Sequence, residues 1–273
     1  FQNCNTLKKV ECVSNSKLKI IGQFAFNETA IESFTIPCTV TKIDQSAFHY
    51  CNMLKKVKFE ENSKLRIISK SSFDNTKIES IEIPSNVYMI KNSAFYHCEN
   101  LKKVAFLSDS NLRTIGNCSF NSTALESVSI PSSVTVIKNN AFGNCENMEK
   151  VEFAENCKLR YIESYSFSES AITNIMIPKQ VIEIGCSAFS NCESLEKVEF
   201  HEKSELRKIE DSAFDSTSIK SIIIPPSVTE VEEDVFCSCE EIESVFIPSN
   251  SPLRSISECF LESSSIKKIF IPQ

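Results

Sequence analysis

Apolar residues recur along the chain at two interleaved spacings that predict a coil of short strands. The leading residues of one series are Leu7, Leu54, Leu101, Met148, Leu195 and Ile242, and those of the other are Ile31, Ile78, Leu125, Ile172, Ile219 and Ile266. Steps of 24 and 23 residues alternate between the series, and further apolar residues follow each leading residue at +3 and +5. Successive side chains of a strand point to opposite faces, so this alternation indicates one half-buried strand in each coil. One such unit cannot bury its apolar side alone, and the repetition therefore predicts a stacked solenoid.

A proline marks every second coil. The prolines that follow an isoleucine at 47-residue spacing are Pro37, Pro84, Pro131, Pro178, Pro225 and Pro272. Proline offers no backbone donor to a neighbouring strand, so we expect each of these strands to end at the isoleucine. We predict one domain over residues 1–273, made of about twelve coils of 23–24 residues arranged as 47-residue double repeats. The strands should form a parallel sheet on the concave face of a curved, right-handed coil, with turns or short helical pieces on the convex side.

A phenylalanine occupies one position in almost every coil. The members of this column are Phe26, Phe48, Phe73, Phe95, Phe120, Phe142, Phe167, Phe189, Phe214, Phe236 and Phe260. In one coil type the ring follows alanine, a small-then-large step that suits a tight helical turn with the ring pointing inward. We expect these rings to fill the interior of the solenoid.

The thirteen cysteines would favour a disulfide framework in a secreted chain, but their spacing argues against one. One column repeats every 47 residues, and the intervening coils carry Thr or Ser at its position. Neighbouring members are two coils, or roughly 9.6 Å, apart, beyond the ~7 Å Cα limit of a disulfide. We predict that their small polar groups satisfy the backbone of the following loop. The members of this structural ladder of unpaired thiols are Cys51, Cys98, Cys145, Cys192 and Cys239, with Cys4 in the first coil.

Composition argues against several classes of function. The 36 acidic residues outnumber the 29 basic ones, which disfavours nucleic acid, because that affinity comes from clustered Lys and Arg. No apolar run approaches the ~20 residues of a membrane helix, so we expect no membrane insertion in this segment. The sequence has no catalytic elbow, zinc-binding helix motif or glycine-rich phosphate loop, and we predict no enzyme and no cofactor. Cys237 with Cys239, or Cys186 with Cys192, suggests metal binding, but zinc needs four converging ligands and we expect no metal site.

Side chains at +2 and +4 of each predicted strand point away from the core and define what a partner would contact. The +4 column turns apolar near the C-terminal end, where its members are Met176, Ile223, Phe246 and Phe270, interrupted by Glu199. Large apolar side chains clustered on a polar surface indicate a contact region, and these four are our candidate partner-binding residues. The alternative is that a C-terminal segment or a second copy buries them.

Lysines form a second outward column, at +2 of every second coil. Its members are Lys9, Lys56, Lys103, Lys150 and Lys197. We interpret this column as a solubilising row offset by acidic neighbours, because single surface charges contribute little. An anion-binding track is the alternative, which makes the lysines a weaker candidate site.

Departures from the repeat cluster near the C-terminal end. Ile247-Pro248 places a proline after the other strand type. The chain starts in mid-coil at Phe1 and ends directly after a strand at Ile271-Pro272, so neither end has the polar cap that a solenoid needs. We therefore expect a segment of a longer array, or self-association through uncapped ends.

The units share one motif, I-P-S-x-V-x-x-I-x-x-x-A-F-x-x-C-x-x-L-x-x-V-x-F, as in the stretch from Ile83 to Phe106. This motif resembles the BspA-like leucine-rich repeats, which are typical of bacterial surface antigens and expanded in trichomonad and amoebic protists. Low glycine with abundant Lys, Ser, Asn and Ile is similar to a protist version. The resemblance covers essentially all 273 residues. It implies a leucine-rich repeat solenoid and a surface or secreted protein that adheres to host cells and matrix proteins.

Two observations on localisation point in different directions. Glycosylation sequons begin at Asn27, Asn117 and Asn121, which favours export. Thirteen cysteines without a pairing scheme suit a reducing compartment equally well. We predict a non-catalytic protein-binding scaffold at the cell surface or in secreted form, whose partner is a host surface or matrix protein, or a neighbouring subunit. The alternative is an intracellular structural subunit or scaffold of a protein assembly.

Overall fold

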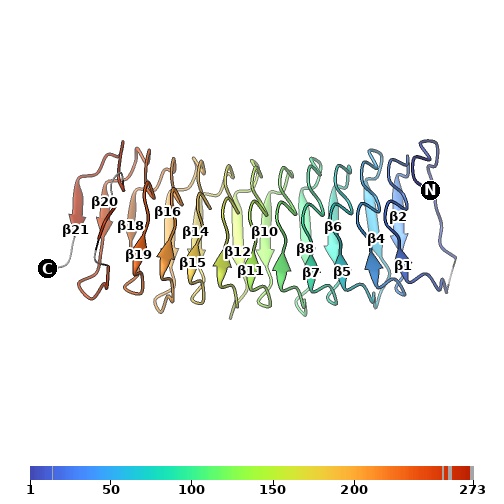
Figure 1. The fold of residues 1–273 in the computed structure, drawn as a ribbon, viewed down its shortest axis with the longest axis horizontal. Helices are drawn as coiled ribbons and strands as arrows, with labels where there is room; N and C mark the ends of the chain where they lie inside the picture. Colours follow the sequence, from blue (N-terminus) through green and yellow to red (C-terminus); the bar gives the residue numbers. More distant parts are fainter. Residues whose placement is uncertain (14, 254, 258–259, 271–273) are drawn as a thin grey trace.

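The protein is a parallel β-solenoid, as a computed structural model shows (Figure 1). The structure describes residues 1–13, 15–253, 255–257 and 260–270. The coils stand in one row from the N-terminal end to the C-terminal end (Figure 1). Each coil pairs with its neighbours through parallel strands, which confirms the predicted stacking.

Long strands of three or four residues form one side of the solenoid. An eight-stranded sheet contains β2 (Ser33–Ile36), β4 (Lys56–Phe59), β6 (Ser80–Ile83), β8 (Lys103–Phe106), β10 (Ser127–Ile130), β12 (Lys150–Phe153), β14 (Asn174–Ile177) and β16 (Lys197–Phe200). A three-stranded sheet contains β18 (Ser221–Ile223), β20 (Ser244–Phe246) and β21 (Lys268–Phe270). Within β2, Phe34 and Ile36 are buried while Ser33 and Thr35 are exposed, as the +3 and +5 pattern predicts.

The long strands differ from the prediction at the first coil. Residues 7–13 form no strand, although Leu7, Val10 and Cys12 pack against the core. Residues 7–13 have a neighbouring strand on one side only, and within the described residues a single backbone hydrogen bond, from the Glu32 amide to the Lys8 carbonyl, joins them to the next coil. Four strands of the proline series end at the isoleucine as expected, at Ile36, Ile83, Ile130 and Ile177, whereas β18 ends one residue before it, at Ile223. Pro272 lies outside the described residues.

A second row of strands makes the prediction of one strand per coil wrong. These two-residue strands form a ten-stranded sheet of β1 (Ile20–Ile21), β3 (Lys42–Ile43), β5 (Ile67–Ile68), β7 (Met89–Ile90), β9 (Thr114–Ile115), β11 (Val136–Ile137), β13 (Tyr161–Ile162), β15 (Glu183–Ile184), β17 (Lys208–Ile209) and β19 (Glu230–Val231). The second residue of each strand is buried and the first is not. Two residues are too few to produce an alternating pattern in the sequence, so this sheet gave no strand signal.

The predicted helical pieces are also wrong, because the described part of the chain contains turns in their place and no helix. Around Phe48, for example, Ser46 and Tyr50 both have φ of 54°. Residues two before and two after the core phenylalanine take this left-handed conformation in coil after coil. A positive φ interrupts the right-handed α conformation every four residues, so a helix cannot extend. Within the described residues there is accordingly no helix that could cross a membrane.

Glu169 offers a test of this strained turn. It is an exposed residue with φ of 56°, a conformation that costs an L-residue about 1–2 kcal/mol and glycine almost nothing. We expect Glu169→Gly to raise the free energy of unfolding by about 0.5–1 kcal/mol in urea denaturation. The matched control is Glu193→Gly, at an exposed residue outside the positive-φ set, which should lower it. Equal losses in both variants would contradict the role of the turn.

Stacked phenylalanine rings form the axis of the core, as predicted. From Phe48 to Phe236, neighbouring ring centroids are 5.1 to 5.6 Å apart with interplanar angles of at most 7°. Phe260 breaks this stack, since it meets Phe236 edge-on at 83°. The irregular coil recognised in the sequence is therefore the place where the core changes its packing.

Candidate binding surfaces

Three of the four predicted partner-contact residues lie side by side near the C-terminal end of the long-strand side. Ile223 of β18 stands opposite Phe246 of β20, which stands opposite Phe270 of β21. The three residues are 63%, 42% and 51% exposed, respectively. The rings of Phe246 and Phe270 are 5.6 Å apart and tilted by 51°. They form a continuous exposed row, which we call the apolar patch.

Met176, the fourth predicted residue, is separated from the apolar patch. It is half exposed on β14 and stands opposite Glu199 of β16. The Glu199 carboxylate bonds Lys197 at 2.7 Å, so a charged pair lies between Met176 and the coil of Ile223. The structure therefore brings together three of the four residues.

Met176 instead lines a groove that the sequence analysis did not predict. This groove, of about 850 Å³, opens where β12 and β14 end, and Phe153, Asn156 and Pro178 line it with Met176. An equivalent groove occurs two double repeats earlier around Phe59. The sequence held a signal for these grooves, because four coils of the cysteine type carry phenylalanine at +5, where the alternate coils carry isoleucine, and these four rings are only partly buried.

The lysine column divides into paired and unpaired members. Nζ–Oε distances of 2.6, 2.6 and 2.7 Å join Lys9 to Glu11, Lys150 to Glu152 and Lys197 to Glu199. Lys56 and Lys103 form no ion pair within the described residues. Exposed pairs of this kind contribute at most about 1 kcal/mol. The charges of Lys56 and Lys103 are thus the ones left open to an anionic partner.

The column cysteines from Cys51 onward are buried and their thiols bond to the preceding coil, whereas Cys4 in the first coil is exposed. The Cys98 thiol donates to the Phe73 carbonyl at 3.1 Å, and Thr76 Oγ1 lies 3.2 Å from the same sulfur. The same arrangement recurs at Cys51, Cys145, Cys192 and Cys239. At Phe120, Phe167 and Phe214 no described backbone amide donates to the carbonyl, and the hydroxyl of the same coil and the thiol of the next coil satisfy it together. The twelve cysteines that the structure describes are free thiols, and Cys259 lies outside the described residues.

Burial makes these thiols poor nucleophiles. It raises the pKa of Cys98 to about 12 and that of Cys145 to about 11, against small opposing effects of the Thr76 and Thr123 hydrogen bonds. Burial likewise raises the pKa values of Cys51, Cys192 and Cys239. Because the thiolate is the reactive form, these five buried thiols cannot supply a nucleophile at neutral pH.

We expect the buried column to resist alkylation in the native protein. At about pH 8, iodoacetamide should modify the exposed Cys4 rapidly and Cys98 and Cys145 only after unfolding in urea. Peptide mass spectrometry of native and unfolded samples measures this difference. Modification of Cys98 at the rate of Cys4 in the native state would contradict the ladder geometry.

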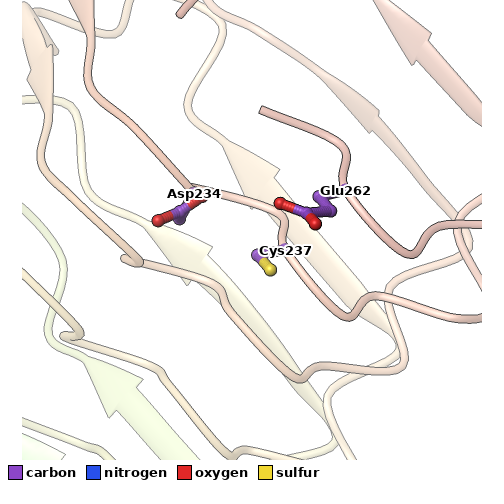
Figure 2. A group of neighbouring side chains, drawn as sticks. All are labelled: Asp234, Cys237 and Glu262. Carbon is purple, nitrogen blue, oxygen red and sulfur yellow. The ribbon is translucent and has the colours of Figure 1, made fainter. Parts of the chain in front are cut away.

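Asp234, Cys237 and Glu262 form the one group of converging metal-type donors among the described residues (Figure 2). Their ligand atoms lie within 4.8 Å of one another, and Glu262 belongs to the next coil. Cys239 does not join them, because its thiol donates to the Phe214 carbonyl in the buried ladder. Three donors fall short of the four that structural zinc requires, so the group assigns no metal.

Comparison with protein families agrees with this architecture. The family model described as "BspA type Leucine rich repeat region" matches six copies within residues 1–100, 66–175 and 160–273. The chain belongs to the BspA-type leucine-rich repeat family. A comparison with curated proteins finds no match.

Solved structures share the fold of this BspA-type chain at low identity. The pneumococcal vaccine antigen PcpA is 23% identical with a TM-score of 0.58, over 92% of this chain and 73% of that one. A leucine-rich repeat protein from Eubacterium ventriosum is 21% identical with a TM-score of 0.52, over 89% and 73% of the two chains. A leucine-rich cell surface protein from Faecalibacterium prausnitzii is 24% identical with a TM-score of 0.45, over 94% and 85%. At these identities the first two likenesses establish the fold alone.

Proposed function

We propose that this BspA-type leucine-rich repeat protein is a non-catalytic scaffold that binds a host surface or matrix protein from the cell surface or in secreted form. The apolar patch carries this proposal. Ile223, Phe246 and Phe270 are exposed in cross-strand register on a side whose other outward residues are mostly Lys, Ser and Glu. Aromatic and aliphatic anchors that become desolvated dominate the energy of protein interfaces. The description of PcpA as a vaccine antigen supports a surface location.

The partner would lie along the long-strand side, which we propose to be the concave face of a right-handed coil. Solenoids of repeats use such extended concave surfaces for binding. A partner long enough to reach beyond Glu199 would also contact Met176 and the groove beside it. Lys56 and Lys103, which lack ion pairs among the described residues, would add electrostatic steering for an acidic partner.

The second candidate is an intracellular structural subunit of a protein assembly. The twelve free thiols favour it, because thiols in an exported protein meet an oxidising environment. Fully reduced thiols on protein from its natural source would support this candidate, whereas glycan at Asn27, Asn117 or Asn121 would support export.

One binding experiment separates the two candidates. The immobilised protein is incubated with a panel of purified extracellular matrix proteins and, in parallel, with a cell lysate of the organism that produces it. The proposal predicts saturable binding to a matrix protein. Binding confined to the lysate would overturn the surface role in favour of the intracellular scaffold.

A further inference from the structure

All five arginines of the chain occupy one position of the repeat. They are Arg66, Arg113, Arg160, Arg207 and Arg254, each 47 residues after the last, and Lys19 holds the same position in the first double repeat. The 24 lysines, by contrast, are spread over many positions. Arg254 lies outside the described residues. Confinement of one residue type to one column indicates that its side chain is needed there.

Backbone hydrogen bonds place these cations in single file. The Tyr88 amide donates to the Arg66 carbonyl at 3.0 Å, and the Arg113 amide donates to the Tyr88 carbonyl at 2.9 Å. The same alternating ladder runs from Lys19 to Arg207, immediately before the short strands. Because two coils separate successive cations, they are roughly 9.6 Å apart along the solenoid axis. We call Lys19, Arg66, Arg113 and Arg160 the arginine track.

The guanidinium groups have no structural task in the fold. All four described arginines are exposed, and none of their side chains forms a hydrogen bond or ion pair with a described residue. The residue after the arginine varies between repeats as Ile67, Thr114, Tyr161 and Lys208, so neighbouring surface positions have diverged. Packing therefore gives no reason for the arginine to persist.

The charges around the column limit the track to its N-terminal part. Lys64 and Lys158 lie two residues before Arg66 and Arg160 and add positive charge. Farther along, Glu205 takes the equivalent place beside Arg207. There Glu230 and Glu232 also approach Lys208 Nζ to 3.8 and 2.7 Å. An anion would meet repulsion at this end.

We propose that the arginine track binds a linear sulfated polysaccharide, at a site separate from the apolar patch. A guanidinium presents a planar fork of donors that matches sulfate. A pyranose unit is about as long as one coil is thick, so sulfates on alternate sugars would meet successive cations. Tyr88, 37% exposed between Arg66 and Arg113, offers a ring face for a sugar. Duplex nucleic acid fits poorly, because its dense charge would face a protein of net charge −7 through a single row of cations.

Heparin is the probe for this site, with chemically desulfated heparin and duplex DNA beside it. Titration calorimetry at low and at physiological ionic strength should show binding of heparin that weakens with salt and is lost on desulfation. Replacement of Arg66, Arg113 and Arg160 by Gln should weaken heparin binding about tenfold, because three exposed charged contacts are lost together.

The matched control replaces three exposed lysines that directly precede long strands by Gln, at Lys55, Lys102 and Lys220, which changes the net charge equally. This variant should bind heparin within about twofold of the wild-type protein. Equal losses in the two triple variants would overturn the track in favour of a net-charge effect. Absence of heparin binding at low ionic strength, or binding of DNA as tight as that of heparin, would also overturn it. Circular dichroism and urea unfolding of both variants confirm that each is folded.

Discussion

Phe142→Ala should destabilise the protein by about 3–5 kcal/mol, the largest effect that we expect of a single substitution. The Phe142 ring is fully buried and stacks on Phe120 at 5.3 Å and on Phe167 at 5.4 Å. Its removal leaves a cavity and also breaks a continuous stack in the middle of the array. Each coil is stabilised by its neighbours, so the loss should uncouple the two halves of the solenoid. Urea denaturation followed by circular dichroism measures the change, and a broadened or split transition is expected.

Phe246→Ala is the matched control for this experiment. It removes the same side chain from an exposed position of the apolar patch, and the expected loss is about 1 kcal/mol or less. Similar losses for Phe142→Ala and Phe246→Ala would contradict the assignment of the phenylalanine column to the core.

Alkaline pH should destabilise the protein through its buried thiols. The pKa values of Cys98 and Cys145 are about 12 and about 11 in the folded state, against an ordinary value of 9.0. Below about pH 8 both states keep these protons, and the stabilisation is fully present. As the pH rises from about 9 towards the folded pKa values, the unfolded chain releases protons that the folded chain retains. The free energy of unfolding should therefore fall by up to about 1.4 kcal/mol per pH unit for each thiol.

The double variant Cys98→Thr, Cys145→Thr tests whether these two thiols cause the loss of stability at alkaline pH. Threonine does not ionise, and the neighbouring coils already use it at the equivalent position. Urea denaturation between about pH 8 and 10.5 should show a steeper loss of stability for the wild-type protein than for the variant, because two titrating groups are absent from the latter. Equal slopes would contradict the burial of these thiols.

The repeating positions explain why most of the fold could be predicted from the sequence. Each inward position of a long strand is apolar in nearly every coil, so a pattern that is weak in one unit becomes unambiguous over the array. The Ile-Pro steps likewise located strand ends at Ile36 and Ile83. Where a strand is long enough for inward and outward residues to alternate, the spacing of its apolar residues predicts it clearly.

The sequence analysis missed the two-residue strands and the positive-φ turns, because residue type alone does not determine either of them. The two-residue strands, such as β3, owe their existence to pairing with the coils on both sides rather than to a local preference. The turns around Phe48 use Ser46 and Tyr50 at positive φ, where glycine or asparagine is the usual signal. Without that signal, the small-then-large Ala-Phe step was misread as helical.

The candidate surfaces were likewise predicted only in part from the sequence. The +4 column predicted that Ile223, Phe246 and Phe270 lie in one row, because the register of the strands follows directly from the repeat. Met176 was grouped with them as another apolar member of that column, and the structure places the Lys197–Glu199 ion pair between Met176 and Ile223. The arginine track was visible as a 47-residue spacing of one residue type, but it lies before a strand that the sequence did not predict.

Binding of the matrix protein identified in the panel, by wild-type protein and two charge-matched double variants, tests the proposed function most directly. Ile223→Glu with Phe246→Glu places two charges in the apolar patch, whereas Thr35→Glu with Ser129→Glu places two in the same outward column far from it. The proposal predicts a loss of at least about 2 kcal/mol of binding free energy for the first variant, roughly 30-fold in affinity, and little change for the second. Unchanged affinity of a folded Ile223→Glu, Phe246→Glu variant would contradict the proposal.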